Sequence, residues 1–142
     1  MKILFVLENY IPHIGGVEIV FKNLAEGLVK RGHVVSIITH RLEGTKKYEK
    51  IEGVNIHRVN CFYSRYWFTF LSVPKVLKLG KKADLIHTTT FNGAFPSWIA
   101  SKLLRKKNLI TIHEVWKNNW NTLTEMNKFQ AKIHDLLESL IY

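Results

Sequence analysis

The first forty residues constrain the fold most strongly, because a short apolar strand runs there through a glycine-bearing loop into a helix and a second strand. The loop spans residues 8–18 and contains the pair Gly15-Gly16. Glycines at the start of a helix let backbone N–H groups approach an anion closely, and the helix dipole adds positive potential there. The opening segment therefore predicts a strand-loop-helix unit that faces a phosphate-bearing ligand.

Apolar runs of strand length alternate with helical patterns along the chain, which is typical of a parallel sheet. The expected fold class is α/β, a doubly wound, mainly parallel sheet with helices on both faces, whose ligands bind beyond the carboxyl ends of the strands. A charged, glycine-containing segment from Arg41 to Gly53 is predicted to be an exposed loop. Strands are predicted at Lys2–Leu7, His33–Thr39, Val54–Val59, Asp84–Thr88 and Asn108–Ile112.

Four helices are predicted between and after these strands. The second runs from about Arg65 to Lys78, where Pro74 is expected to kink or divide it. The third begins near Pro96, and the last begins at a capping box from Thr122 to Glu125. The first helix is expected to bury Val17, Val20, Phe21, Leu24, Ala25 and Leu28, the third Ile99, Leu103 and Leu104, and the last Phe129, Ile133, Leu136 and Leu140.

Length and charge narrow the class of protein. A chain of 142 residues is long enough for one domain with a core. The formal charge of +10 favours anionic partners such as nucleotide phosphates, an anionic membrane surface or nucleic acid. A single cysteine, Cys61, excludes an internal disulfide and fits a reducing cytoplasm. No apolar run approaches the roughly 18 residues of a membrane-spanning helix.

Other nucleotide and nucleic-acid sites are less well supported. The loop lacks the spacing G-x-G-x-x-G, and no acid follows the second strand to hold a ribose, so a dinucleotide-binding Rossmann protein is a minor alternative. The Gly-Lys-Ser or Gly-Lys-Thr of a P-loop is absent. Aromatic and basic residues occur together around Trp67 and Trp116, but no nucleic-acid-binding module is present, so no specific nucleic acid is expected as a partner.

Several motifs together resemble a known family. They are a proline before Gly15-Gly16-Val17-Glu18, then Leu24-Ala25, Leu28, Arg31-Gly32-His33-Val34-Val35 and Thr39, followed by Asp84-Leu85-Ile86-His87 and Thr111-Ile112-His113-Glu114. Their order and spacing resemble the N-terminal, acceptor-side domain of retaining GT-B glycosyltransferases of glycosyltransferase family 4. The resemblance covers the chain up to about Glu114.

This resemblance implies transfer of a sugar from a nucleoside-diphosphate sugar to a hydroxyl acceptor, lipid-linked or glycan, with retention at the anomeric carbon. Such enzymes have two Rossmann-like domains across a cleft, and the C-terminal one holds the nucleotide. Residues 1–142 are then expected to form a single Rossmann-like N-terminal domain, a fragment that is inactive without the C-terminal nucleotide-sugar domain. A natural half-enzyme that binds acceptor or membrane and needs a separate nucleotide-binding partner remains the alternative.

The resemblance also implies roles for individual residues. Gly15 and Gly16 would present N–H groups to the donor diphosphate; the alternative is that the pair only permits a tight turn. His113 would contact a sugar or acceptor hydroxyl, unless it is bonded locally in its loop. Weaker acceptor-side candidates are Glu18, which also suits the helix dipole, and Thr89, Thr90, Asn92 and Glu114. No metal and no cofactor are expected, and His87, within or at the end of a buried strand, is interpreted as a hydrogen-bonded core or rim residue rather than a ligand.

The segment from Phe62 to Leu71 is rich in aromatic residues and precedes four lysines, Lys75, Lys78, Lys81 and Lys82. A helix with this composition suits attachment to an anionic membrane surface, while part of its aromatic side chains would belong to the core. The expected location is cytoplasmic, with peripheral attachment to the inner face of the membrane left open.

Overall fold

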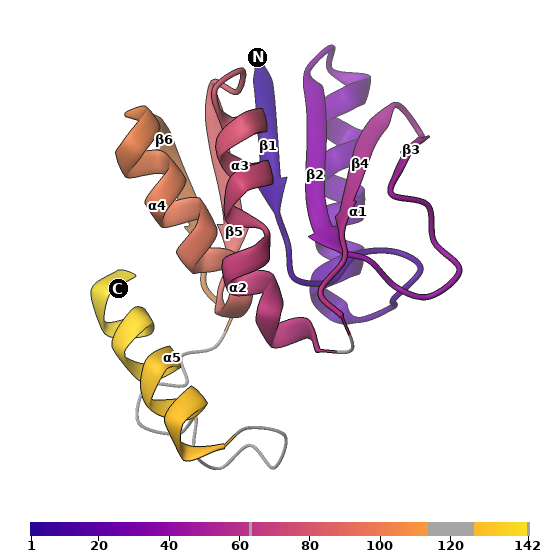
Figure 1. Ribbon diagram of the computed structural model, residues 1–142. Helices are drawn as coiled ribbons and strands as arrows, with labels where there is room; N and C mark the ends of the chain where they lie inside the picture. Colours follow the sequence, from indigo (N-terminus) through magenta and orange to yellow (C-terminus); the bar gives the residue numbers. More distant parts are fainter. Residues whose placement is uncertain (63, 114–126, 142) are drawn as a thin grey trace.

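A six-stranded sheet with helices on both faces forms the domain (Figure 1). The computed structural model describes residues 1–62, 64–113 and 127–141. The strand order is β3-β4-β2-β1-β5-β6, and every pairing is parallel except that of β3 with β4. The strands are β1 (Lys2–Val6), β2 (Val34–His40), β3 (Tyr48–Ile51), β4 (Val54–Val59), β5 (Leu85–Thr89) and β6 (Lys107–Thr111). This architecture confirms the predicted fold class.

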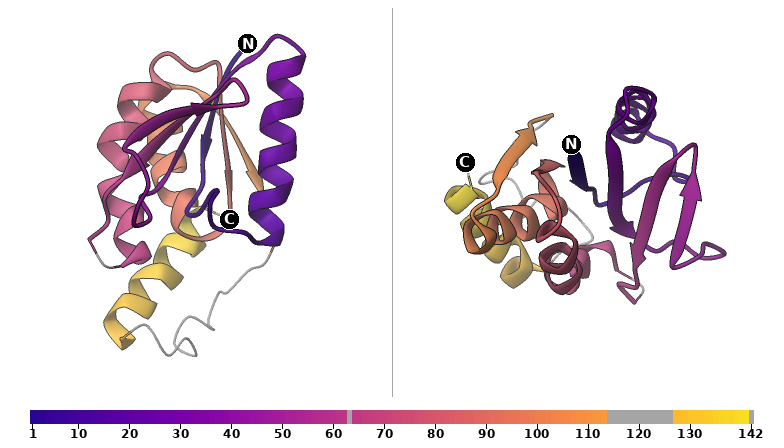
Figure 2. Two further views of the ribbon diagram at one scale, coloured as in Figure 1. Left: turned by 90° about the vertical axis from the view of Figure 1, so that its right-hand side faces the viewer. Right: turned by 90° about the horizontal axis from the view of Figure 1, so that it is seen from above.

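The central strand β1 is buried on both faces, as a parallel sheet covered by helices requires. Successive residues of β1 point to opposite faces of the sheet, and each face carries its own hydrophobic core. Phe5 packs with Phe21 of α1 (Gly16–Lys30) on one face. Leu4 packs with Val76 of α3 (Val73–Gly80) and Ala100 of α4 (Ala94–Leu104) on the other. Figure 2 shows α1 on one side of the sheet and α3 and α4 on the opposite side.

The segment from Arg41 to Gly53 is only partly a loop, so the prediction was wrong for Tyr48–Ile51. These residues form β3, which pairs antiparallel with β4 through a turn at Glu52 and Gly53. Both turn residues have left-handed backbones, with φ of 47° and 81°, and this geometry suits a two-residue hairpin. The strand was missed because only one of its four residues, Ile51, is aliphatic, and exposed and half-buried residues alternate along it.

The predicted second helix is divided, as expected from its proline. A 3-10 turn at Arg65–Trp67 leads into α2 (Phe68–Leu71), and α3 follows after Ser72 with Pro74 in its first turn. In the other helices some apolar residues face solvent contrary to expectation, because each helix contacts the sheet along a narrower stripe than its apolar pattern suggests. These residues are Val20, Leu24 and Leu103, with exposed fractions of 52%, 37% and 65%.

The last helix, α5 (Lys128–Ile141), is oriented differently from the prediction. Asn127 and Gln130 form a reciprocal capping pair at its start, whereas the predicted cap from Thr122 to Glu125 lies outside the described residues. The helix buries Ala131, His134 and Glu138 against the domain, and it leaves Phe129, Leu136 and Leu140 exposed. It rests on α4 and on Tyr66, so the covered face is narrow and centres on these three residues. Of the four residues predicted to be buried, only Ile133 is half-buried. Within the described parts of the chain, every helix is too short or too polar to cross a membrane.

His87 of β5 is a core residue, as predicted. It is 6% exposed, and its Nε2 lies 2.8 Å from the Thr111 hydroxyl. Its ring packs edge-on against Phe5 and Phe21, with ring centroids 5.2 and 5.1 Å apart. Burial lowers the pKa of His87, and it lowers the pKa of His57 and His134 as well.

The domain is therefore expected to lose stability as the pH falls below about 6.5, the ordinary pKa of histidine. Below that pH the unfolded chain binds protons that the folded chain excludes, so acid favours unfolding. Urea unfolding at about pH 7.5 and about pH 5.5 should show a lower free energy of unfolding at the lower pH. His87→Gln should show a shallower pH dependence, and an unchanged slope would contradict the assignment.

Candidate functional site

The candidate site lies at the carboxyl edge of the sheet, where the parallel strands end together at the bottom of Figure 1. The N–H of His40 donates to the Glu8 carbonyl over 3.0 Å, which links the ends of β2 and β1. The N–H of Arg41 donates to the Val59 carbonyl over 2.8 Å, which links the ends of β2 and β4. The loops that follow these three strands therefore begin side by side.

The glycine pair forms the start of α1 at this edge. Gly15 is the N-cap residue with an extended backbone (φ −152°, ψ 174°), and it has no side chain to cap the first N–H groups of the helix. Gly16 is exposed, and a Cβ atom built on it would meet nothing within 4 Å. The backbone around Gly16 is thus open to a ligand at the positive end of the helix dipole.

Glu18 belongs to the same loop and has local partners. It is 8% exposed, and its carboxylate lies 3.2 Å from Nδ1 of His13. A Cβ atom on Gly15 would overlap this carboxylate, so a larger residue at position 15 would make the Glu18 side chain shift. A carboxylate in the first turn also complements the helix dipole.

The polar residues at the end of β5 and just after it lie next to the glycine loop, because β5 pairs with β1. Thr89 and Thr90 are 5% and 0% exposed, and their hydroxyls have no hydrogen-bond partner among the described residues. Asn92 is also buried, and its side-chain oxygen accepts a hydrogen bond of 2.8 Å from the Thr69 hydroxyl. The two threonine hydroxyls therefore keep unused hydrogen-bonding capacity at this edge, whereas the side-chain oxygen of Asn92 is already hydrogen-bonded to Thr69.

Gly93 closes the turn after β5 against β1. A Cβ atom built on it would lie 2.7 Å from the Val6 carbonyl oxygen and 2.8 Å from the Thr88 hydroxyl. That hydroxyl itself donates to the Val6 carbonyl over 2.7 Å. The backbones of the two loops thus approach each other closely at the middle of the edge.

His113 lies two residues beyond the end of β6 and is exposed. Because β6 is the edge strand next to β5, His113 is on the same edge as the glycine loop but one strand farther than the threonines. Glu114 lies outside the described residues.

Cys61 is buried, which raises the pKa of its thiol to about 11, so it is not an activated nucleophile.

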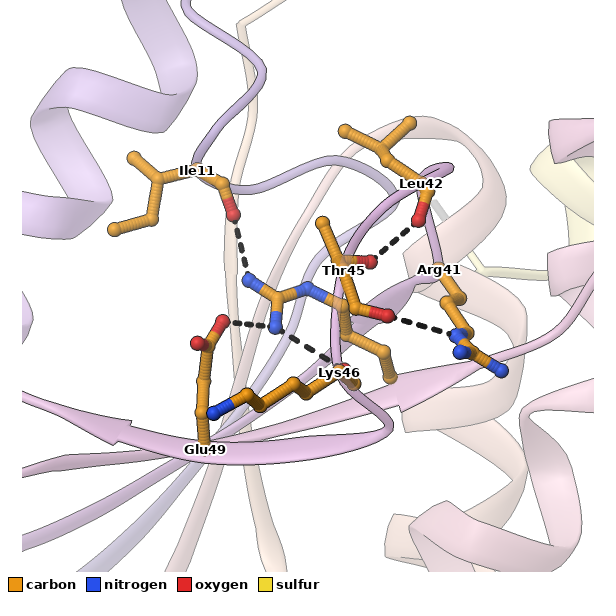
Figure 3. Close-up of polar contacts among 7 residues, drawn as sticks. Ile11, Arg41, Leu42, Thr45, Lys46 and Glu49 are labelled. Atoms are coloured by element: carbon orange, nitrogen blue, oxygen red, sulfur yellow. Dashed lines mark hydrogen bonds and ion pairs between the residues drawn. The ribbon is translucent and has the colours of Figure 1, made fainter.

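An ionic cluster that the sequence interpretation missed supports the glycine loop. Arg58 of β4 is 4% exposed and donates to the Ile11 carbonyl over 2.8 Å and to the Lys46 carbonyl over 3.3 Å. It also forms an ion pair with Glu49 of β3. Figure 3 shows these contacts converging on one guanidinium group. Arg58 thus connects the glycine loop, the loop after β2 and the edge strand.

A signal for this cluster exists in the sequence. Alternation along β4 places Arg58 on the same buried face as Val54 and Ile56. A charged residue in such a position needs a partner.

Tyr10 fills the core beside the glycine loop at 3% exposure, and burial together with Glu26 raises its pKa to about 12. Its hydroxyl therefore stays protonated at neutral pH.

Comparisons with known proteins agree with this arrangement. A family model described as Glycosyltransferase Family 4 matches residues 14–141. An uncharacterized glycosyltransferase of Methanocaldococcus jannaschii is 41% identical over 95 residues, which cover 61% of this chain and 24% of that protein. The alpha-monoglucosyldiacylglycerol synthase of Streptococcus pneumoniae is 32% identical over 108 residues, which cover 72% of this chain and 24% of that protein.

Among solved structures, the sucrose-phosphate synthase of Thermosynechococcus elongatus superposes with a TM-score of 0.68 and 15% identity. The superposition covers 99% of this chain and 40% of that protein, and at this identity it concerns the fold alone. The chain spans about a quarter of the length of the curated relatives that it matches.

Proposed function

This chain belongs to glycosyltransferase family 4, and we propose that the complete protein moves a sugar from a nucleoside-diphosphate sugar to a hydroxyl acceptor with retention at the anomeric carbon. This chain is the acceptor-side domain in that proposal, and a second domain holds the nucleotide. The observation that carries the proposal is the open backbone at Gly16, because it lies at the carboxyl edge and at the positive end of α1. The matched region begins at Ile14, just before the glycine pair.

In this mechanism the chain contributes positioning and electrostatics. The N–H groups at Gly15 and Gly16 stabilise the negative charge that grows on the diphosphate as the glycosidic bond breaks. The imidazole of His113, which is exposed, binds a hydroxyl of the sugar or the acceptor, whereas the hydroxyls of Thr89 and Thr90 are buried at the same edge. His113 has no assigned role as a general base here, because no acidic residue in the described chain is paired with it.

The first experiment is a transfer screen with a panel of nucleotide sugars and hydroxyl acceptors, run on the complete protein and on residues 1–142 alone. We expect product only with the complete protein, because the nucleotide is held by the other domain. Product from residues 1–142 alone would contradict the assignment of this chain to one half of the site. Should the gene encode no second domain, activity that appears only with a separate nucleotide-binding subunit would identify a split enzyme.

A second candidate property is attachment to an anionic membrane, which rests on one face of the domain. Trp67, Phe70 and Leu71 are 52%, 42% and 37% exposed around α2. The Phe70 ring contacts Phe95 of α4, with centroids 5.9 Å apart. Lys78 and Lys81 are exposed and continue the same helical row. These two lysines, together with Trp67, Phe70 and Leu71, form what we call the aromatic-basic face. The relative from Streptococcus pneumoniae is named for a monoglucosyldiacylglycerol product, which is consistent with an acceptor at a membrane.

Residues 1–142 are therefore expected to co-sediment with vesicles that contain anionic lipid at low salt, and to be released by high salt. Replacing Lys78 and Lys81 together with glutamine should weaken binding about thirtyfold, since each lysine near such a surface contributes roughly 1 kcal/mol. Trp67→Ser should also weaken it, whereas Tyr48→Ser, at an exposed aromatic residue on β3, should not. Equal binding to vesicles of neutral lipid, or no binding at low salt, would contradict the attachment.

A further inference from the structure

A hollow of about 560 Å³ opens between the loop after β2 and the loop after β4. Its size lies within the range of small-molecule sites. It is at the same carboxyl edge as the glycine loop, because β2 lies between β1 and β4. None of the residues proposed above to contact the sugar donor or the acceptor substrate lines this hollow. The lining side chains are His40, Arg41, Leu42, Glu43, Asn60 and Phe62.

The wall formed by the loop after β2 is held in place by several hydrogen bonds. Nε of Arg41 donates to the Thr45 carbonyl over 3.1 Å, and the Thr45 hydroxyl donates to the Leu42 carbonyl. Arg58 holds the next residue through the Lys46 carbonyl. The hollow is therefore largely formed before any ligand arrives, which lowers the entropic cost of binding.

Polar groups with spare hydrogen-bonding capacity face this hollow. The two terminal nitrogens of Arg41 have no partner among the described residues, and Figure 3 shows them pointing away from the Arg58 cluster. The side-chain oxygen of Asn60 accepts from the N–H of Phe62 over 3.0 Å, which leaves the amide NH₂ as a donor. Glu43 is exposed and adds a carboxylate acceptor. Donors and an acceptor thus occur together, with charges that offset each other.

Phe62 provides the aromatic part of the lining, beside the aliphatic Leu42. Its side chain is 67% exposed, and its backbone is left-handed with φ of 49°. Residues with a side chain rarely adopt this conformation, because it crowds the Cβ atom, and burial of the ring does not offset the strain. The strained backbone places an aromatic ring at the rim of the hollow, an arrangement that points to a binding role.

We propose that this hollow binds a sugar ring of the acceptor, with Phe62 against the apolar C–H face of the ring and Arg41, Glu43 and Asn60 on its hydroxyls. The electron-rich face of an aromatic ring attracts the C–H groups of a pyranose, while planar guanidinium, amide and carboxylate groups pair with neighbouring hydroxyls. The carboxylate of Glu43 disfavours a phosphate, and the charged groups of Arg41 and Glu43 in the lining disfavour an acyl chain. This inference rests on the proposed function, and it specifies the acceptor as a glycan or a glycolipid headgroup.

Saturation-transfer difference NMR on residues 1–142 tests the inference, with methyl glycosides of common hexoses as probes and glycerol 1-phosphate as the competing ligand. Irradiation of aromatic protons should transfer saturation to the ring C–H protons of at least one glycoside at millimolar concentration. Phe62→Ala should reduce this signal at least fivefold, and Arg41→Met should weaken binding about tenfold. Phe129→Ala removes an aromatic side chain with a similar exposed fraction, 73%, and should leave the signal unchanged.

Three results would overturn the inference. They are the absence of signal for every glycoside, an equal signal in Phe62→Ala, and preferential binding of glycerol 1-phosphate. Phe62→Gly, which relieves the left-handed backbone, replaces Phe62→Ala if the alanine variant unfolds. The two experiments distinguish failure of the proposed function from failure of this inference. If only the proposed function fails, the transfer screen of the complete protein gives no product while glycosides still bind to this domain.

Discussion

Replacing Gly16 with valine is expected to reduce kcat/KM for sugar transfer by the complete protein about 10²- to 10³-fold, the loss typical of removing one charge-stabilising contact. The isopropyl group would cover the backbone where the donor diphosphate is proposed to bind. The domain itself should accept the side chain, because a Cβ at Gly16 meets nothing within 4 Å. Thermal unfolding of the variant should therefore match that of the unmodified protein within about 0.5 kcal/mol.

Gly27→Val is the matched control for this variant. Gly27 lies in the same helix, and a Cβ atom there also meets nothing within 4 Å, but it is about three turns away from the carboxyl edge. We expect Gly27→Val to transfer sugar at the unmodified rate. An equally active Gly16→Val would show that the glycine pair only permits the turn, and equal losses in both variants would show a general effect on α1.

Arg58→Ala is expected to lower the free energy of unfolding by about 2–4 kcal/mol. The substitution removes hydrogen bonds to the Ile11 and Lys46 carbonyls and leaves Glu49 without its ion-pair partner. Arg58 connects three segments in this way, so the loss should appear as a lower urea midpoint with an unchanged m-value. The glycine loop should also exchange its amide hydrogens faster, because its connection through Ile11 is lost.

Two comparisons separate the cluster from its surroundings. Lys50→Ala, at an exposed residue of β3, should change stability by less than about 0.5 kcal/mol. The double variant Arg58→Met with Glu49→Leu should be more stable than Arg58→Ala, because it leaves no unpaired charge and refills the volume. If Arg58→Ala is as stable as Lys50→Ala, the cluster does not hold the loop.

The sequence predicted the parts of the fold that depend on apolar pattern and on glycine. The central strands are buried on both faces and therefore appear as apolar runs, and the start of α1 follows directly from Gly15-Gly16. The polar strand β3 was missed, because its residues contribute pairing to β4 rather than an apolar face. The orientation of α5 was also wrong, since an apolar stripe does not reveal which side of a helix will be covered.

The candidate site could be predicted less completely than the fold. Topology alone places the glycine loop, the threonines after β5 and His113 at one edge, because parallel strands end together. Local contacts could not be predicted, such as Asn92 accepting from Thr69 across 23 positions of sequence. The Arg58 cluster and the hollow beside it likewise depend on β3 and on the loop after β2, whose conformation the charged sequence does not specify.

The anomeric configuration of the product is the sharpest test of the proposed transfer reaction. The complete protein is incubated with its best nucleotide sugar and acceptor from the screen, and the first product is analysed by proton NMR before it can equilibrate. We expect transfer to an acceptor hydroxyl with the same anomeric configuration as in the donor, and loss of that product in Gly16→Val. A product of inverted configuration, or no transfer from any nucleotide sugar, would contradict it.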